Sequence, residues 1–135
     1  MLAVVASCHA ADTIVVTDAW VRPSLGPATS SALYMTLRNV GAVADVLVGV
    51  ATPVAAVSQL HTSEVSNGVV SMHALSRLDL LPGQVVELAP KGTHVMLTGL
   101  TQSLKAGDRI AVTLRFSRQA ALTISAVVGL SAPAR

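Results

Sequence analysis

Aromatic side chains are scarce in this chain of 135 residues, which has one Trp, one Tyr and one Phe. Proteins that hold single-stranded nucleic acid usually stack its bases on aromatic rings, so we expect no nucleic-acid partner. Charge is scarce too, since Asp, Glu, Lys and Arg together make up 12% of the residues. The nine basic residues are scattered and form no basic run. The formal net charge of +2 therefore indicates solubility and not an anionic partner.

Cysteine and long apolar runs are also lacking, because the one cysteine is Cys8. A single thiol excludes a disulfide framework within the chain and a zinc site built from several cysteines. Beyond the first residues, no run approaches the about 20 apolar residues that a membrane-spanning helix needs. A chain of this length is most simply a single domain that buries its own core.

The first 11 residues, MLAVVASCHAA, resemble the end of an export signal, with a short apolar run followed by small residues. The basic region that opens such signals is missing, which suggests a truncated start. VASC, ending at Cys8, has the form of a bacterial lipoprotein cleavage site, whereas cleavage after Ala10 would be ordinary signal processing. Both alternatives stay open. We expect residues 1–11 to be a signal remnant and residues 12–135 to form one folded domain.

From Thr13 onward, short runs rich in β-branched residues alternate with turn signals. Many short strands without a convincing amphipathic helix predict an antiparallel sandwich or barrel. Helix is the alternative in residues 30–37 and 51–60, where Ala and Leu leave the periodicity ambiguous. The runs in which we expect strands are 13–22, 32–39, 44–50, 57–65, 68–75, 84–89, 94–100, 109–116 and 121–128.

The dipeptide Asn67-Gly68 is the strongest hairpin signal in the chain, because both central residues of a type I′ turn need positive φ. With these two residues as the loop, Ser66 pairs with Val69. The register of the two flanking runs then follows by counting, and a loop one residue longer would turn every side chain of one run to the other face.

This register places a histidine and a methionine on one face of the hairpin. His61 lies opposite Ala74, and Met72 lies opposite Ser63. His61 and Met72 become diagonal neighbours, about 7–8 Å apart at the backbone. A second such pair, a histidine and a methionine two residues apart, lies in the run HVMLTGL at residues 94–100, where alternate residues of a strand share a face.

The two pairs form the pattern H-x10-M-x21-H-x-M, made by His61, Met72, His94 and Met96. Imidazole and thioether groups suit monovalent copper, and thioethers stay available outside the cytoplasm, where thiols tend to form disulfides. Methionine is a poor zinc ligand, the seven acidic residues are too dispersed for calcium or magnesium, and a blue-copper centre needs a cysteine thiolate. The pattern therefore predicts a Cu(I) site.

Three segments, AWVRPSLGPATSSALYMTLRN, LHTSEVSNGVVSMHAL and APKGTHVMLTGL, resemble the periplasmic PCu(A)C-type copper chaperones, and the resemblance runs from about Asp18 to about Phe116. The spacing above is that family's motif. The resemblance implies a cupredoxin-like Greek-key antiparallel β-sandwich that binds Cu(I) at an exposed surface patch. It also implies a periplasmic metallochaperone that delivers copper to the dinuclear copper centre of cytochrome c oxidase. The expected partners are the copper-receiving subunit of that oxidase or its assembly factors, and we expect a monomer.

A second hypothesis stays open, in which the chain is a β-sandwich protein-interaction module without metal and the His and Met residues only pack. Met35 is expected in the core in either case. Trp20 is expected to be half-buried near a sandwich edge, and Val95 and Leu97 or their neighbours to form an apolar rim around the site.

The other chemistry-bearing residues form no catalytic pattern. His73 follows Met72 directly, so it should point to the opposite face and into solvent. The serines show no nucleophile elbow, and no glycine-rich phosphate loop is present in the sequence. We therefore expect that the protein is not an enzyme.

Overall fold

The computed structural model describes residues 13–24, 29–90 and 92–132. The predicted export signal and Cys8 lie outside the described part of the chain. Ten strands and no helix occur in the described residues. The strands are β1 (Ile14–Val21), β2 (Ser30–Asn39), β3 (Asp45–Ala51), β4 (Ala55–Ser66), β5 (Val69–Leu75), β6 (Leu78–Leu80), β7 (Val85–Leu88), β8 (His94–Leu100), β9 (Arg109–Phe116) and β10 (Leu122–Val128).

The all-β prediction is confirmed, and each of the nine predicted runs overlaps a different strand. The stretches in which helix was the alternative lie in β2 and, for the most part, in β4. Strand β6 was not predicted, because its three residues are too few to display a period.

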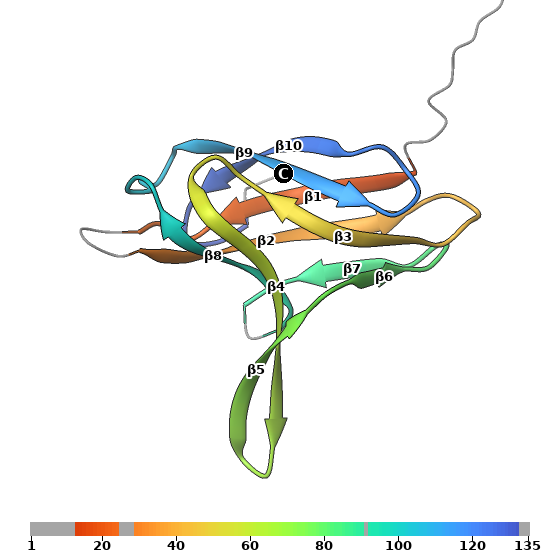
Figure 1. The fold of residues 1–135 in the computed structure, drawn as a ribbon, viewed down its shortest axis with the longest axis horizontal. Helices are drawn as coiled ribbons and strands as arrows, with labels where there is room; N and C mark the ends of the chain where they lie inside the picture. Colours follow the sequence, from red (N-terminus) through yellow and green to blue (C-terminus); the bar gives the residue numbers. More distant parts are fainter. Residues whose placement is uncertain (1–12, 25–28, 91, 133–135) are drawn as a thin grey trace, which may run out of the picture.

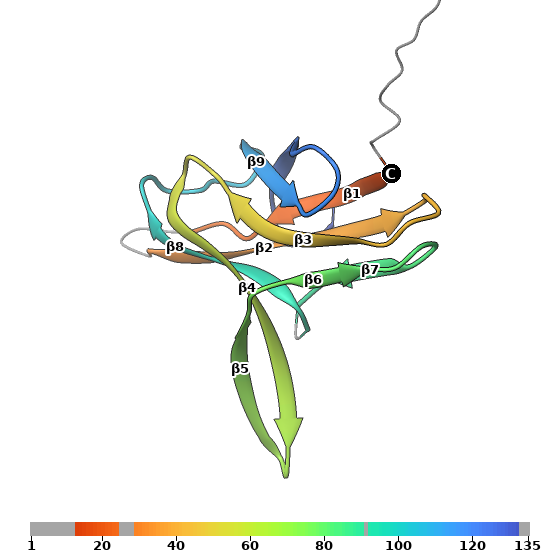
Figure 2. The same ribbon diagram turned by 45° about the vertical axis from the view of Figure 1, so that its right-hand side comes forward.

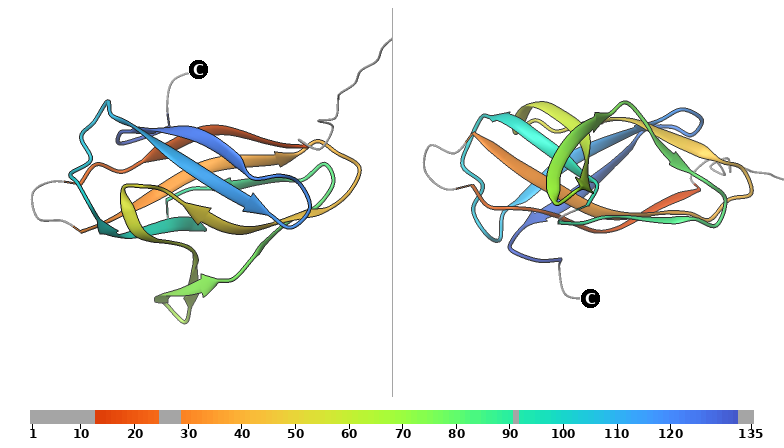
Figure 3. Two further views of the ribbon diagram at one scale, coloured as in Figure 1. Left: turned by 45° about the horizontal axis from the view of Figure 1, so that its top comes forward. Right: turned by 90° about the horizontal axis from the view of Figure 1, so that it is seen from below.

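The strands are hydrogen-bonded in the order β5-β4-β8-β2-β1-β10-β9-β3-β6, with β7 also paired to β2. All pairings are antiparallel among the described strands except that of β1 with β10, which is parallel. One cluster of buried side chains includes residues of β2 and β8 as well as residues of β3 and β9. Strand β1 therefore joins two groups of strands that share a core, and these strands gather into an elongated body (Figures 1 and 3).

A bulge in β1 makes this junction. Between Thr17 and Trp20 the register to β2 shifts, and Asp18 adopts a positive φ of 56°. A bulge increases the local twist and re-aims the residues that follow it. After the bulge, Trp20 and Val21 pair with β10. The parallel pairing of β1 with β10 thus begins directly after the bulge.

Strand β8 shows how the sheet separates the core from its other face. Val95 and Leu97 have 0% exposure and belong to the core, as does Met35 of β2 at 1%. His94 and Met96 alternate with them, so their side chains leave from the opposite face. The expectation that Val95 and Leu97 or their neighbours form an apolar rim around the site is therefore wrong for Val95 and Leu97 themselves, whereas the prediction for Met35 is confirmed.

Strands β4 and β5 form a hairpin that projects from the body (Figures 1 and 2). The turn residues Asn67 and Gly68 have φ values of 53° and 78°, as a type I′ turn requires. Ser66 pairs with Val69, so the predicted register is confirmed along the whole hairpin. The first half of β4, from Ala55 to His61, pairs with β8, which connects the hairpin to the rest of the sheet.

Candidate metal centre

The two predicted histidines lie directly opposite each other in adjacent strands. His61 of β4 pairs with His94 of β8, and their ring centroids are 6.0 Å apart. His61 is partly buried, whereas His94 is only 5% exposed. The pairing of β4 with β8 therefore brings together two imidazoles that are far apart in sequence.

The two methionines lie on either side of this histidine pair. Met96 is on the same face of β8 as His94, and it pairs with Gln59 of β4. Met72 pairs with Ser63, which is two residues from His61, so Met72 also shares the face of the histidines. Met96 is partly buried and Met72 is 54% exposed. All four predicted residues thus lie on one continuous face that runs from β8 across β4 to β5.

An open hollow of about 620 Å³ lies over this face. Met72, His94 and Met96 line it, and His61 is not among its lining residues. The wall is mostly apolar, and its further members are Arg22, Ser30, Ser31, Ala32, Tyr34, Ser63, Val65, Val70 and Pro90. The hollow is large enough to admit part of another molecule to the three lining candidates.

The hydrogen bonds of the two imidazoles differ. Nδ1 of His94 lies 3.0 Å from the carbonyl oxygen of Gly92. Nε2 of His61 lies 3.3 Å from Oε1 of Gln59. Nδ1 of His61 is buried and has no hydrogen-bond partner among the described residues. A buried imidazole nitrogen without a partner is uncommon, and a metal ion would satisfy it.

Aromatic rings support His94 from the other side. The Tyr34 ring centroid is 6.3 Å from that of His94 and 4.6 Å from that of Trp20. Arg22 donates from Nε to the Tyr34 hydroxyl at 3.0 Å, and its guanidinium carbon is 5.8 Å from the Tyr34 ring centroid. Trp20 is 7% exposed, so the expectation of a half-buried Trp20 is wrong. The bulge in β1 explains this burial, because it aligns Trp20 with Tyr34.

Sequence reasoning missed Tyr34 and the two valines that line the hollow. Val65 and Val70 pair across the hairpin and are 72% and 65% exposed. The count from Asn67-Gly68 that located Met72 would also have placed these valines on its strand face. For Tyr34 no local signal was available, since its position depends on the pairing of β2 with β8.

The opposite face of the hairpin carries a separate polar pair. Nε2 of His73 lies 3.2 Å from Oε1 of Glu64, and both side chains are more than half exposed. The prediction that His73 points away from Met72 into solvent is therefore confirmed. The part of the chain that the structure describes contains no cluster of three or more His, Cys, Asp or Glu residues suited to a metal.

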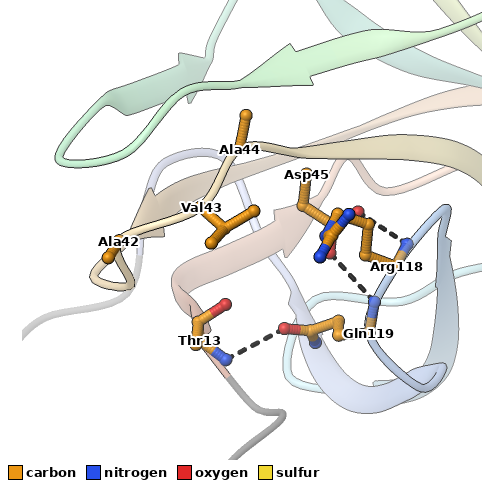
Figure 4. A pocket seen from close by; sticks show the side chains of 7 residues that line it. All are labelled: Thr13, Ala42, Val43, Ala44, Asp45, Arg118 and Gln119. Atoms are coloured by element: carbon orange, nitrogen blue, oxygen red, sulfur yellow. Dashed lines mark hydrogen bonds between the residues drawn. The ribbon is translucent and has the colours of Figure 1, made fainter.

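A smaller hollow at the other end of the body is lined by hydrogen bonds that hold separate segments together (Figure 4). The carboxylate of Asp45 accepts hydrogen bonds from the backbone N–H groups of Arg118 and Gln119 at 2.8 and 3.0 Å. Oε1 of Gln119 in turn accepts from the N–H groups of Thr13 and Ile14, both at 3.0 Å. These bonds attach the start of β1 and the start of β3 to the loop after β9. The described residues that line this hollow include no His or Met.

The profile of a known family, described as "Putative lipoprotein LpqE-like", matches residues 14–128. The chain belongs to the LpqE-like family. A curated relative from Leifsonia xyli subsp. xyli (strain CTCB07), "Putative lipoprotein Lxx21020", is 38% identical over 108 residues, or 79% of this chain. The chain spans 64% of that relative's length.

Solved structures of PCuAC domains share the fold. The copper-bound PCuAC domain from PmoF2 is 28% identical, with a TM-score of 0.75 over 91% of this chain and 96% of the other. CuI-DR1885 from Deinococcus radiodurans is 32% identical, with a TM-score of 0.67 over 88% of this chain and 81% of the other. The resemblance to PCu(A)C-type proteins and the cupredoxin-like β fold are therefore confirmed. Among the described residues, no helix is long and apolar enough to span a bilayer.

Proposed function

We propose that this protein is a metallochaperone that carries one Cu(I) ion as cargo on His61, Met72, His94 and Met96. The observation that carries the proposal is the strand register, which brings both histidines and both methionines to one face beneath an open hollow. The similarity to copper-bound PCuAC domains supports it independently.

The donor set fits monovalent copper. Two neutral thioethers and two imidazoles are soft or borderline ligands, which Cu(I) prefers, and they bring no negative charge to the site. Nδ1 of His61 is buried and has no hydrogen-bond partner among the described residues. Its lone pair is therefore free to coordinate a metal ion. The described residues that line the hollow include no Asp or Glu, so a hard divalent cation would find no carboxylate ligand there.

The uneven exposure of the ligands suggests how copper leaves. His94 is buried and Met96 partly buried on β8, whereas Met72 is 54% exposed on the projecting hairpin. A donor atom of a partner can therefore approach beside Met72 first. Release of that thioether needs no proton, so copper passes to the partner by exchange of one ligand at a time.

The remaining parts of the proposal concern location and partner. The lipoprotein description of the family supports export from the cytoplasm. We place the protein in the periplasm, either free or anchored through Cys8, and name the copper-receiving subunit of cytochrome c oxidase or its assembly factors as recipient. A monomer without catalytic activity suffices for this role.

The competing hypothesis is a metal-free interaction module in which these residues only pack. It would place Met72 in contact with the core and would give each imidazole nitrogen a hydrogen-bond partner. Met72 is instead more than half exposed, and one nitrogen of His61 is orphaned. Both observations favour the copper carrier.

Anaerobic titration with Cu(I), read by native mass spectrometry and copper K-edge absorption, tests the proposal. The wild-type protein should bind one Cu(I) with sulfur and nitrogen ligands. Met72→Leu and Met96→Leu should each weaken binding. Met35→Leu is the matched control, because this methionine is buried in the core at 1% exposure and should not affect copper. Unchanged affinity in both site variants would overturn the proposal.

A further inference from the structure

The two histidines offer different ring nitrogens for a further bond. In His94, Nδ1 lies 3.0 Å from the Gly92 carbonyl oxygen, which can only accept a hydrogen bond. Nδ1 must therefore carry the proton in the neutral ring, and Nε2 keeps its lone pair. A backbone carbonyl that fixes the tautomer in this way is a common support for a metal-binding histidine.

In His61 the two ring nitrogens have the opposite roles. Nε2 lies 3.3 Å from Oε1 of Gln59, two residues earlier on the same face of β4. Nδ1 is buried and has no partner in the described part of the chain. If Nδ1 carried the proton, the ring would bury an unpaired N–H group, which folded proteins rarely tolerate. With the proton on Nε2, the Gln59 oxygen accepts it, and the orphan is a lone pair that a metal ion can use.

We infer that Gln59 is a positioning residue that holds His61 in its Nε2–H tautomer, so that His61 presents Nδ1 and His94 presents Nε2 to the metal. The assignment of the metal-binding nitrogens rests on the proposed copper function. The assignment of the tautomers concerns the metal-free protein.

The place of Gln59 in the sheet fits this role. It pairs with Met96 of β8, and its side chain contacts the ring of His61. The amide thus lies next to two of the proposed ligands while donating no bond to copper itself. Loss of an outer hydrogen bond of this kind typically lowers metal affinity by about 10- to 100-fold.

Nitrogen-15 NMR of the histidine rings tests the tautomers directly. In the metal-free protein we expect the Nε2–H form for His61 and the Nδ1–H form for His94. On addition of Cu(I), which is diamagnetic, the resonances of His61 Nδ1 and His94 Nε2 should shift. An Nδ1–H form of His61, or a copper-induced shift that is larger at its Nε2 than at its Nδ1, would overturn the inference.

Three variants separate positioning from folding. Gln59→Leu should populate both tautomers of His61 and weaken Cu(I) binding by about tenfold or more. Gln59→Glu keeps an acceptor oxygen and should restore the Nε2–H tautomer. Gln102→Leu, at an exposed glutamine outside the hollow, should change neither readout.

The outcomes for this inference and for the proposed function can be told apart. Failure of the wild-type protein to bind Cu(I) would overturn the proposed function and the ligand half of the inference, whatever the tautomers. Binding with equal affinity and equal tautomers in wild type and Gln59→Leu would overturn the role of Gln59 and leave the copper carrier intact.

Discussion

The proposed copper site is divided between two regions that differ in how firmly they are held. Strand β8 is hydrogen-bonded to β4 on one edge and to β2 on the other, and it buries alternate residues in the core. Among the described strands, β5 pairs with β4 alone, and six of its seven residues are exposed. In the proposed site, β8 therefore provides firmly held ligands, and β5 provides a ligand from the edge of the sheet.

This difference matters for the proposed carrier function, in which the protein both holds and releases copper. Segments with few buried apolar contacts open locally at low free-energy cost, whereas core strands open only when the protein unfolds. A ligand on β5 can leave the metal without disturbing the core, while ligands on β8 keep their positions. The division allows tight retention and release from the same site.

The largest expected effect is on stability, and it distinguishes the two regions. Leu97→Ala on β8 removes a core side chain with 0% exposure and should lower the free energy of unfolding by about 2–5 kcal/mol. The matched change on the hairpin, Val70→Ala, affects a side chain that is 65% exposed and should cost less than about 0.5 kcal/mol. Urea denaturation measures both. Similar losses in the two variants would show that the hairpin is as much a part of the core as β8.

The second prediction concerns the effect of metal on the hairpin. Cu(I) at about 100 times its dissociation constant should raise the free energy of unfolding by about 2.7 kcal/mol, because it binds only the folded state. Hydrogen exchange should show added protection mainly in β5, which is little buried before copper binds. Removal of copper with a chelator should reverse both effects. Protection confined to β8 would mean that Met72 does not take part.

The parts of the site that local rules control could be predicted from the sequence. The Asn67-Gly68 turn set the register of the hairpin, and the placement of Met72 opposite Ser63 followed from it. Strand alternation placed His94 and Met96 on one face. The same alternation should have sent Val95 and Leu97 to the core, so that error came from applying the rule to only half of the strand.

The parts that depend on distant pairing could not be predicted. His61 lies opposite His94 because β4 pairs with β8, and no local pattern specifies which strands become neighbours. The burial of Trp20 depends on the bulge at Asp18, where φ is positive. An Asp within a run of strand-forming residues does not by itself predict a bulge. Spacing could therefore identify the four proposed ligands, but only the assembled sheet shows that they share a face.

The smallest expected effect tests whether the hairpin turn serves copper or only the fold. Gly68 and Gly83 both have positive φ, 78° and 76°, and a Cβ added to either would meet no atom within 4 Å. Replacement by Ala should therefore cost each turn about 1 kcal/mol of backbone strain, with no steric clash. Gly68 is at the tip of the hairpin that carries Met72, whereas Gly83 lies in the turn between β6 and β7. We expect similar small losses of stability by urea denaturation, but weaker Cu(I) retention against a competing chelator in Gly68→Ala alone. Equal retention in the two variants would mean that the hairpin turn does not control how β5 presents its thioether.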